Sequence, residues 1–265
     1  MTRTLYAIIG DPIAQARSPE VFNKLFAERG IDAEMVALHV TADKLEAALE
    51  GLAAIDNFAG ALITIPHKAA AAGIATCRSP RVDVAGVANV LRPSASGWSA
   101  DLFDGEGFVA GLRHCGHGVA YRSAAVVGAG GAGMAIATAL LDAGVDHVAV
   151  HAVDSSRAKI ACGRLATTYG ARVHQRAPSK ADQLVVNATP IGMKEDDDLP
   201  FDLGLLAPAA VVADAIMKPP RTRLLTEAAR RGHPIQEGRH MLDGQAESIW
   251  RFLAIDSVGT VPFPA

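Results

Sequence analysis

The amino-terminal part of the chain alternates short apolar runs with longer stretches bounded by capping residues. Short apolar runs that stop at Gly or Pro are typical of buried strands, whereas runs that begin at Ser, Thr or Pro and end at Gly are typical of helices. We predict strands at residues 6–10, 33–40, 60–65 and 88–92, with a polar turn at 93–97. We predict helices at 18–29, with Ser18 as its cap, from Thr41 to about 52, and at 67–75. This alternation predicts an open α/β sheet.

The second half of the chain repeats this order of strand and helix. Apolar runs predict strands at residues 124–127, 147–150, 184–187 and 211–213, with helical segments between them, one of them at 134–143. A last helix is predicted at 245–253. The repetition fits a doubly wound nucleotide-binding sheet. We therefore predict an α/β protein of two domains, an N-terminal open α/β domain (1–103 plus 239–265) and a Rossmann domain (104–238).

A glycine-rich loop lies between the predicted strand at 124–127 and the helix that follows it. Gly128, Gly130 and Gly133 have the G-x-G-x-x-G spacing, and Gly131 and Ala132 complete the loop. In dinucleotide-binding proteins the first glycine allows a tight turn, the second lets the backbone approach a pyrophosphate, and the third lets helix and strand pack closely. The helix N-terminus supplies N–H groups for the phosphates. An ordinary glycine-rich turn of another α/β protein is the alternative.

Composition and charge narrow the function further. Hydrophobic residues make up 50% of the 265 residues and the net charge is −3, so a sizeable core is expected and a nucleic-acid partner is not. No apolar run reaches the ~18 residues of a membrane span, and the first residues lack the layout of a signal peptide. Three scattered cysteines, Cys77, Cys115 and Cys162, fit a reducing compartment. These features predict a cytoplasmic protein.

One short segment could hold a metal ion. His114, Cys115 and His117 offer three candidate ligands within four residues. Zinc sites usually combine two ligand clusters at set spacing, and no second cluster follows here. We therefore interpret the segment as a solvated loop and expect no metal.

Six short motifs occur in order on both sides of the glycine loop. They are Gly10-Asp11-Pro12-Ile13-Ala14 with Ser18-Pro19; Thr64-Ile65-Pro66-His67-Lys68; Gly86-Val87-Ala88-Asn89; Asp104-Gly105 with Gly107-Phe108; Asn187-Ala188-Thr189-Pro190-Ile191-Gly192-Met193; and Gly238 with Met241-Leu242 and Gln245-Ala246. Together they resemble the shikimate and quinate dehydrogenase family over nearly the whole chain. The resemblance implies an oxidoreductase that transfers a hydride between NAD or NADP and a cyclic hydroxy acid, such as shikimate, quinate or a related compound. It also implies a monomer or homodimer whose active-site cleft lies between a substrate domain and a dinucleotide domain.

The resemblance assigns proton transfer to Lys68, paired with Asp104. A lysine must lose its proton to act as a base; burial favours that loss and the charge of Asp104 opposes it. The sequence leaves open whether Lys68 transfers the proton or only orients the substrate. The resemblance places further substrate contacts at Ser18, Thr64, Asn89 and Gln245.

Several positions depart from the family pattern, and all of them lose a polar group. Ala16 replaces a serine and Met217 replaces a tyrosine, which in the family hold the substrate carboxylate; Leu62 replaces an asparagine and Phe103 a threonine. Each hydrogen bond missing to a buried polar ligand costs roughly 1–3 kcal/mol. We therefore expect an active dehydrogenase whose substrate differs near the carboxylate, or which handles shikimate poorly.

The residues after the second nucleotide strand bear on the choice of cofactor. NADP-type members of the family show Asn-Arg-Thr where this chain has Ala152, Val153 and Asp154. A carboxylate at this distance from the glycine loop suits the ribose 2′-hydroxyl of NAD and repels a 2′-phosphate. NAD is therefore the preferred prediction, although Arg157 could still reach a phosphate and Asp154 could serve as a helix cap. The resemblance places the nicotinamide side of the site at Asn187, Thr189, Pro190 and Met193.

Two other functions remain open from the sequence. The chain could be a non-catalytic sensor that binds ligand and dinucleotide, although Lys68 and Asp104 are both present. It could also be a dehydrogenase of an unrelated hydroxylated substrate, which the apolar replacements allow.

Overall fold

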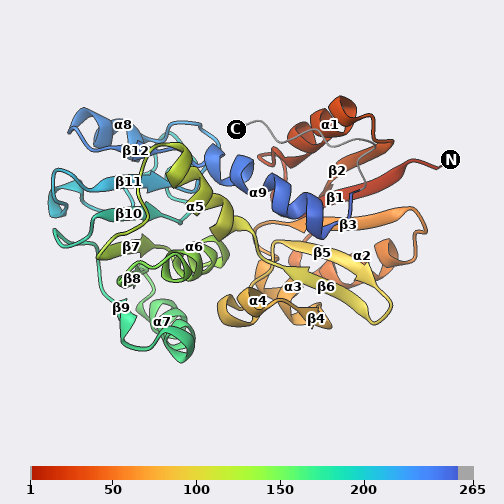
Figure 1. Cartoon of the computed structure of the whole chain (residues 1–265), viewed down its shortest axis with the longest axis horizontal. Helices are drawn as coiled ribbons and strands as arrows, with labels where there is room; N and C mark the ends of the chain where they lie inside the picture. The colour runs from red at the N-terminus through yellow and green to blue at the C-terminus, as the bar shows by residue number, and fades with distance from the viewer. Residues whose placement is uncertain (1, 256–265) are drawn as a thin grey trace. The chain divides into compact units, whose positions relative to one another are not determined.

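The computed structural model describes residues 2–255, and these divide into two compact units (Figure 1). The first unit comprises residues 2–103 and 246–255, and the second comprises Asp104–Gln245. The return to the first unit therefore falls inside helix α9 (Arg239–Phe252). The sequence expectation placed residues 239–245 with the first domain, whereas their contacts group them with the second.

Within the described part of the first unit, six strands form a mixed sheet in the order β2-β1-β3-β5-β6-β4. The strands are β1 (Thr4–Gly10), β2 (Ala33–His39), β3 (Phe58–Ile63), β4 (Cys77–Arg78), β5 (Val90–Ser94) and β6 (Gly97–Asp101). β1 pairs in parallel with β2 and β3, whereas β5 runs antiparallel to both β3 and β6. The predicted α/β class is confirmed, with a sheet that is mixed.

The helices of this unit are α1 (Ser18–Arg29), α2 (Leu45–Ala53), α3 (Lys68–Ile74) and α4 (Pro80–Ala85). α1 ends at Gly30, whose φ of 66° is a left-handed conformation that glycine adopts without strain. The predicted cap by Ser18 is wrong, because Arg17 is the N-cap and Ser18 is the first helical residue. The Arg17 carbonyl oxygen accepts the helical hydrogen bond from Val21 N, so the helix begins one residue earlier than its serine suggests.

Other elements of this unit also differ from those that the sequence predicts. A 3₁₀ turn at Ala42–Lys44 follows Thr41, so α2 begins only at Leu45. The predicted turn at 93–97 is the tip of a hairpin, because Pro93 pairs with Trp98 and Ser94 with Gly97. β4, β6 and α4 were not predicted, since these short elements lack an apolar run or a regular hydrophobic period.

The second unit contains an all-parallel sheet in the order β12-β11-β10-β7-β8-β9, and every residue of this unit is described. The strands are β7 (Ser123–Val127), β8 (His147–His151), β9 (Val173–Gln175), β10 (Leu184–Asn187), β11 (Val211–Asp214) and β12 (Ile235–Gln236). Counted from β7, the strand order is 3-2-1-4-5-6 when read from the β9 edge, which is the order of a Rossmann sheet. The predicted doubly wound domain is therefore confirmed. Figure 1 shows the strands stacked in this order.

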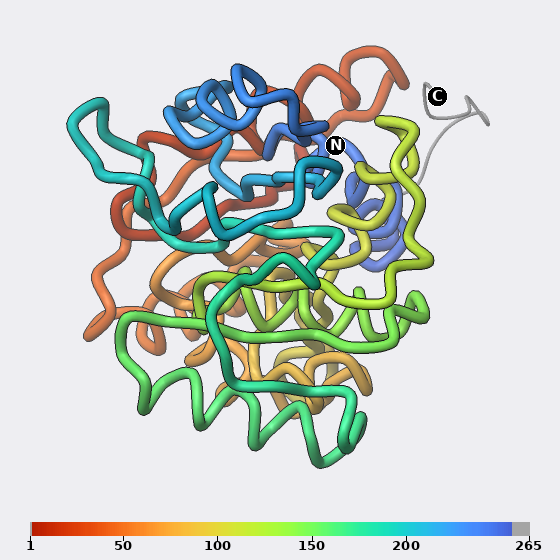
Figure 2. Tube along the Cα trace, turned by 90° about the vertical axis from the view of Figure 1, so that its left-hand side faces the viewer, coloured from red at the N-terminus to blue at the C-terminus, as the bar shows by residue number. Residues whose placement is uncertain are grey.

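The helices of the second unit are α5 (Asp104–His114), α6 (Gly131–Asp142), α7 (Ser155–Tyr169), α8 (Arg223–Arg230) and the first part of α9. α7, drawn in green, runs along the lower edge of this unit in Figure 2. α6 begins at Gly131 instead of residue 134, and α9 begins at Arg239 instead of residue 245. α5, β9 and β12 were not predicted, because α5 is rich in glycine and the two strands are very short.

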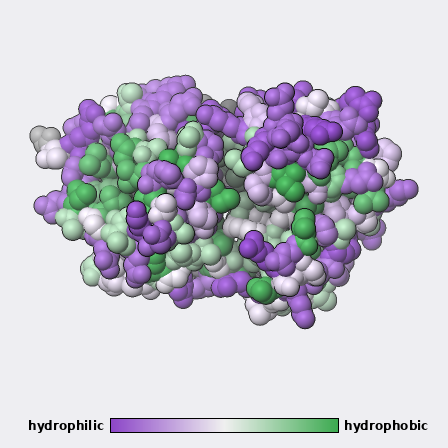
Figure 3. Space-filling view, turned by 180° about the vertical axis from the view of Figure 1, so that it is seen from behind, coloured by the Kyte–Doolittle hydropathy of each residue, from purple (hydrophilic) through white to green (hydrophobic). Residues whose placement is uncertain are grey.

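Each unit has its own apolar core, and the surface mixes polar and apolar side chains. On the face drawn in Figure 3, hydrophobic residues form patches interrupted by hydrophilic ones. Large exposed apolar side chains are spread along the described part of the chain, and Val153 is 94% exposed. Among residues 2–255, no helix combines the length and the apolar character that crossing a membrane requires.

Candidate active site

In the first unit, the predicted substrate residues lie at the carboxyl ends of the central strands. Thr64 directly follows β3, and its N–H donates to the Ile9 carbonyl oxygen of β1 at 2.9 Å. Asp11 N donates in turn to the Ile65 carbonyl oxygen at 2.9 Å. A Cβ at Gly10 would overlap the Thr64 methyl group, so glycine is needed where the two loops meet. The opening loop and the lysine segment are therefore held side by side.

Backbone bonds also bring Lys68 and Asn89 into the same part of this unit. The Lys68 carbonyl oxygen accepts from Ala88 N at 2.9 Å, and Ile63 N donates to the Asn89 carbonyl oxygen at 2.7 Å. The Asn89 side-chain oxygen accepts from Phe103 N at 2.8 Å. Asn89 is buried and Lys68 is half-buried. Besides any substrate contact, Asn89 thus fixes the chain just before Asp104.

The apolar positions that depart from the family pattern share one environment in this unit. Leu62 and Phe103 are each 4% exposed and belong to a single buried cluster, against which Ala16 packs. The Phe103 ring lies 5.9 Å from the Phe252 ring, and the Arg81 guanidinium lies 4.6 Å above it. Hydrocarbon therefore fills the space where the family pattern has polar side chains. Ser18 is also buried, whereas Met217 lies half-buried in the second unit.

In the second unit, Asp104 and Gln245 meet where α5 packs against α9. Both side chains are 4% exposed, and Gln245 Nε2 lies 3.4 Å from Asp104 Oδ1. A Cβ at Gly107 would overlap the Met241 carbonyl oxygen of α9, and one at Gly105 would overlap the Ala135 carbonyl oxygen of α6. The glycines that follow Asp104 therefore allow α5 to lie close to both helices, which fixes the distance between Asp104 and Gln245.

The glycine loop has the geometry that its spacing predicts. Gly128 has a φ of 118°, a conformation that glycine adopts far more readily than other residues. A Cβ at Gly133 would overlap the Gly128 carbonyl oxygen, so the third glycine lets the helix approach the loop. Gly130 has open space around it, with nothing within 4 Å of a built Cβ. The first turn of α6, from Gly131 through Ala132 to Gly133, begins directly behind that space.

A second loop lies beside the glycine loop where the strand order of the sheet reverses. β7 and β10 are neighbours there, and Ala188 N donates to the Val127 carbonyl oxygen at 2.7 Å. A Cβ at Gly128 would lie 2.6 Å from the Ala188 carbonyl oxygen, so the two loops touch. Ligands of open α/β sheets bind at this reversal, outside the carboxyl ends of the strands. The loop also carries Thr189, Pro190 and Met193, which are partly or fully exposed.

Asn187 at the end of β10 is fully buried and bonds to a second buried residue, Asp214, at the end of β11. Asn187 Nδ2 donates to Asp214 Oδ1 at 3.2 Å. Burial raises the pKa of Asp214 to about 6, against hydrogen bonds from Ile216 N, Thr222 Oγ1 and Asn187 that favour the charged form. The sequence motifs assign no role to Asp214. A lone carboxylate at the end of an apolar strand was the available signal.

Asp154 follows β8 and caps α7. Its Oδ1 accepts from Ser156 N at 2.9 Å and from Arg157 N at 3.3 Å, which confirms the capping role that the sequence left open. Its Oδ2 lies 3.5 Å from Arg157 Nε. Both side chains are largely exposed, as is Val153. This part of the loop is therefore open to solvent and carries a carboxylate fixed by the helix.

The histidines of the segment at 114–117 contact other parts of the second unit. His117 Nε2 lies 3.2 Å from the Ile235 carbonyl oxygen, and the centroid of the tilted His114 ring lies 5.5 Å from that of the His240 ring. Within residues 2–255, no three His, Cys, Asp or Glu side chains gather as metal ligands would.

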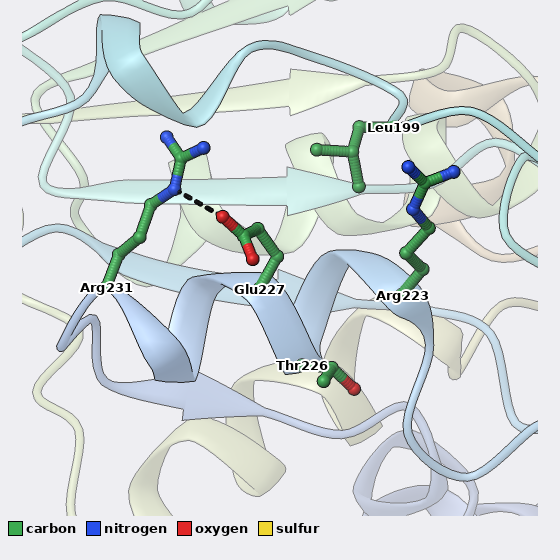
Figure 4. A pocket seen from close by; sticks show the side chains of 5 residues that line it. All are labelled: Leu199, Arg223, Thr226, Glu227 and Arg231. Atoms are coloured by element: carbon green, nitrogen blue, oxygen red, sulfur yellow. Dashed lines mark hydrogen bonds and ion pairs between the residues drawn. The ribbon is translucent and has the colours of Figure 1, made fainter.

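A surface pocket in the second unit lies on α8 (Figure 4). It is lined by Leu199, Arg223, Thr226, Glu227 and Arg231. Glu227 forms ion pairs with Arg231 and with Arg230, which lower its pKa to about 2. Glu227 is thus paired with two arginines, whereas Arg223 Nη1 donates to the Asp197 carbonyl oxygen at 3.3 Å.

Comparison with known proteins places these features in one family. Residues 8–91 match the model of the shikimate dehydrogenase substrate binding domain. A protein named shikimate dehydrogenase (NADP(+)) from Acidiphilium cryptum is 38% identical over 243 residues, which cover 91% of this chain and 87% of that protein.

Solved structures with the same fold include relatives with other names. The 5-ketofructose reductase of a Gluconobacter strain is 26% identical, with a TM-score of 0.84 and coverage of 98% and 95% of the two chains. The quinate dehydrogenase of Corynebacterium glutamicum in complex with NAD is also 26% identical, with a TM-score of 0.84 and coverage of 95% and 93%. The chain therefore belongs to the shikimate/quinate dehydrogenase family of NAD(P)-dependent oxidoreductases.

Proposed function

We propose that the chain is an NAD-linked dehydrogenase of a polyhydroxylated substrate that lacks the carboxylate of shikimate or presents another group in its place. The observation that carries this proposal is the apolar cluster around Leu62 and Phe103, each 4% exposed, with Ala16 packed against it. The proton-transfer residues Lys68 and Asp104 are retained. The reaction is therefore kept while recognition of the substrate changes.

The chemistry divides between the cofactor and the side chains. When bound, NAD would supply the acceptor for the hydride of the carbon that carries the reacting hydroxyl group. Lys68 takes the hydroxyl proton, and returns it when the carbonyl compound is reduced. Asp104 orients that hydroxyl group. Gln245, 3.4 Å from Asp104, and Thr64 bind neighbouring hydroxyl groups of the substrate.

The carboxylate end of the site argues for a different substrate. Ala16 and Met217 offer no hydrogen bond where the family pattern has hydroxyl groups. A buried ligand carboxylate left without partners loses roughly 1–3 kcal/mol for each missing bond, or about tenfold in affinity for every 1.4 kcal/mol. A neutral substituent in place of the carboxylate leaves no buried charge without partners, so it avoids this loss of binding free energy. The fold relative named 5-ketofructose reductase supports this view, because its named substrate is a neutral polyhydroxy ketone.

The cofactor preference rests on Asp154. The α7 cap holds its carboxylate after β8, where a Rossmann sheet receives the adenosine ribose. A carboxylate there accepts from a ribose 2′-hydroxyl and repels a 2′-phosphate. Arg157 Nε lies 3.5 Å from Asp154 Oδ2, so the guanidinium already has an anionic partner within this chain. The proposed cofactor, NAD, differs from the NADP(+) in the name of the Acidiphilium relative. The quinate dehydrogenase structure, in contrast, contains NAD.

Restoring the missing hydroxyl groups tests the substrate proposal. We expect Ala16→Ser with Met217→Tyr to raise kcat/KM for shikimate by roughly 10–100-fold, since each bond regained contributes about 1 kcal/mol or more. Turnover of neutral polyhydroxy substrates should change little. The matched control is Ala14→Ser, at an exposed position of the same loop. An unchanged kcat/KM for shikimate in a folded double variant would contradict the proposal.

A further inference from the structure

Asp214 is a fully buried carboxylate for which the proposed chemistry has no role. It ends β11, beside the end of β10. Its Oδ1 accepts from Asn187 Nδ2 at 3.2 Å and from Ile216 N at 2.9 Å, and its Oδ2 accepts from Thr222 Oγ1 at 2.7 Å. All of these donors are neutral, so no cation compensates the burial of the charge among these bonds. A carboxylate kept under such conditions requires an explanation.

The first arm of this network reaches the loop after β10 through Asn187. Asn187 Nδ2 also donates to the Ile191 carbonyl oxygen at 3.0 Å. Asn187 Oδ1 accepts from Thr189 N at 3.0 Å and from Thr189 Oγ1 at 2.7 Å, and that hydroxyl accepts from Ile191 N at 3.1 Å. Hydrogen bonds to the side-chain amide of Asn187 thus hold residues 189 and 191 of the loop.

Asp214 determines which way that amide points. A carboxylate accepts but does not donate, so only the NH₂ side of Asn187 can face it. If the amide turned over, its oxygen would face the carboxylate and Thr189 N would lose its acceptor. An apolar residue at 214 would remove this selection and free the loop to adopt another arrangement.

The second arm reaches the segment that carries Met217. Ile216 N donates to Asp214 at 2.9 Å, and Thr222 both donates to Asp214 and caps α8 by accepting from Leu225 N. A Cβ at Gly192 would lie 3.4 Å from the Ile216 side chain, so this segment and the loop after β10 pack together.

We infer that Asp214 is a positioning residue, which holds the loop at residues 187–193 and the segment at 216–222 in one arrangement beside the nicotinamide. The inference rests on the proposed function, in which the first loop lies on the nicotinamide side. The glycine loop and Asp154, which receive the other half of the dinucleotide, have no hydrogen bond to Asp214 among those above. Loss of Asp214 therefore impairs hydride transfer more than binding of the adenosine half.

The test compares Asp214→Ala with Asp214→Asn, using NAD and ADP-ribose as probes. We expect Asp214→Ala to lower kcat by about 100-fold, as misplacement of a reacting group by about 1 Å does. It should weaken NAD binding severalfold while leaving the Kd of ADP-ribose within about twofold. Asp214→Asn should recover kcat to within about fivefold, because its oxygen still accepts from Asn187 and Ile216 while its NH₂ group donates to Thr222.

Asp182→Asn is the matched control for lost stability. Asp182 is also fully buried in this unit, but it bonds to Arg176 and Ser123 at another part of the sheet. It should lower the melting temperature without lowering kcat. A folded Asp214→Ala that keeps kcat within about threefold overturns the inference, as does a parallel loss of ADP-ribose and NAD binding. If Asp214→Ala does not fold, Thr222→Val provides the same comparison.

Different results would overturn the proposed function and the positioning role of Asp214. Absence of turnover by the wild-type protein with every hydroxylated substrate overturns the proposed function alone. The difference between NAD and ADP-ribose binding then still decides whether Asp214 positions the nicotinamide half.

Discussion

Two aspartates of the second unit lie in opposite environments, Asp154 shortly after β8 and Asp214 at the end of β11. Asp154 is largely exposed, caps α7 and lies near Arg157. Asp214 is fully buried among neutral donors, and burial raises its pKa to about 6. Residue type alone therefore does not decide the role of an aspartate: exposure suits Asp154 to contact a ribose, whereas burial suits Asp214 to orient neighbouring groups.

The raised pKa of Asp214 predicts a pH-dependent stability. Its pKa is 3.8 in a model compound and about 6 in the folded chain. Because folding raises the pKa, the folded state holds the proton more tightly, and this stabilisation is full below about pH 4 and lost as the pH rises through 6. The loss amounts to about 3 kcal/mol at most. The melting temperature of the wild type should therefore fall relative to that of Asp214→Asn between pH 4.5 and 7.5; a constant difference would contradict this.

The residues after β8 predict a change of cofactor preference. The double variant Val153→Arg with Asp154→Thr should raise kcat/KM for NADP at least tenfold and lower it for NAD, because it adds a guanidinium for the 2′-phosphate and removes the repelling carboxylate. Threonine still caps α7, and Val153 is 94% exposed, so folding should be unaffected. Steady-state kinetics with both cofactors measures the ratio. A wild type that already prefers NADP would contradict the assignment of Asp154.

At the scale of elements, glycines set how closely the helices of the second unit pack. Gly105 and Gly107 lie where α5 meets α6 and α9, and Gly244 of α9 faces Gly107 in return. Close packing of these helices holds Asp104 beside Gln245. The glycines that follow Asp104 are therefore explained by the close packing of these helices.

This packing predicts opposite effects for the same substitution in two helices. Gly107→Ala should lower the stability by about 1–3 kcal/mol or more, because the new methyl group overlaps the backbone of α9. Gly163→Ala in α7 should raise it by about 0.5–1 kcal/mol, since nothing lies within 4 Å of that Cβ and alanine favours a helix. Thermal melting of both variants tests the pair; equal effects would refute the packing argument.

The sequence predicts those elements in which the local pattern and the fold agree. Helix α1 follows from Pro19 and Gly30, and the strand, loop and helix around Gly128 follow from spacing. β12 pairs with β11, a partner distant in the sequence, so it leaves little local signal. The Asn187–Asp214 bond could not be predicted for the same reason, because it joins two strand ends that become neighbours only in the folded sheet.

At the scale of the whole molecule, the residues proposed to carry the family chemistry are distributed over two compact units. Lys68, Asn89 and the apolar cluster belong to the first unit, whereas Asp104, Gln245 and the proposed dinucleotide loops belong to the second. The motifs identified the family because they lie in order along nearly the entire chain. The substrate did not follow from them, since a family resemblance indicates the shared reaction and the departures indicate only what has been lost.

The most direct test is the steady-state kcat/KM of the wild-type protein for shikimate, quinate and neutral polyhydroxy compounds, each with NAD and with NADP. Lys68→Met serves as the inactive control. We predict NAD-linked turnover of a neutral substrate at a kcat/KM at least tenfold above that for shikimate, and loss of this activity by 100-fold or more in the control. Efficient NADP-linked oxidation of shikimate by the wild type would contradict it.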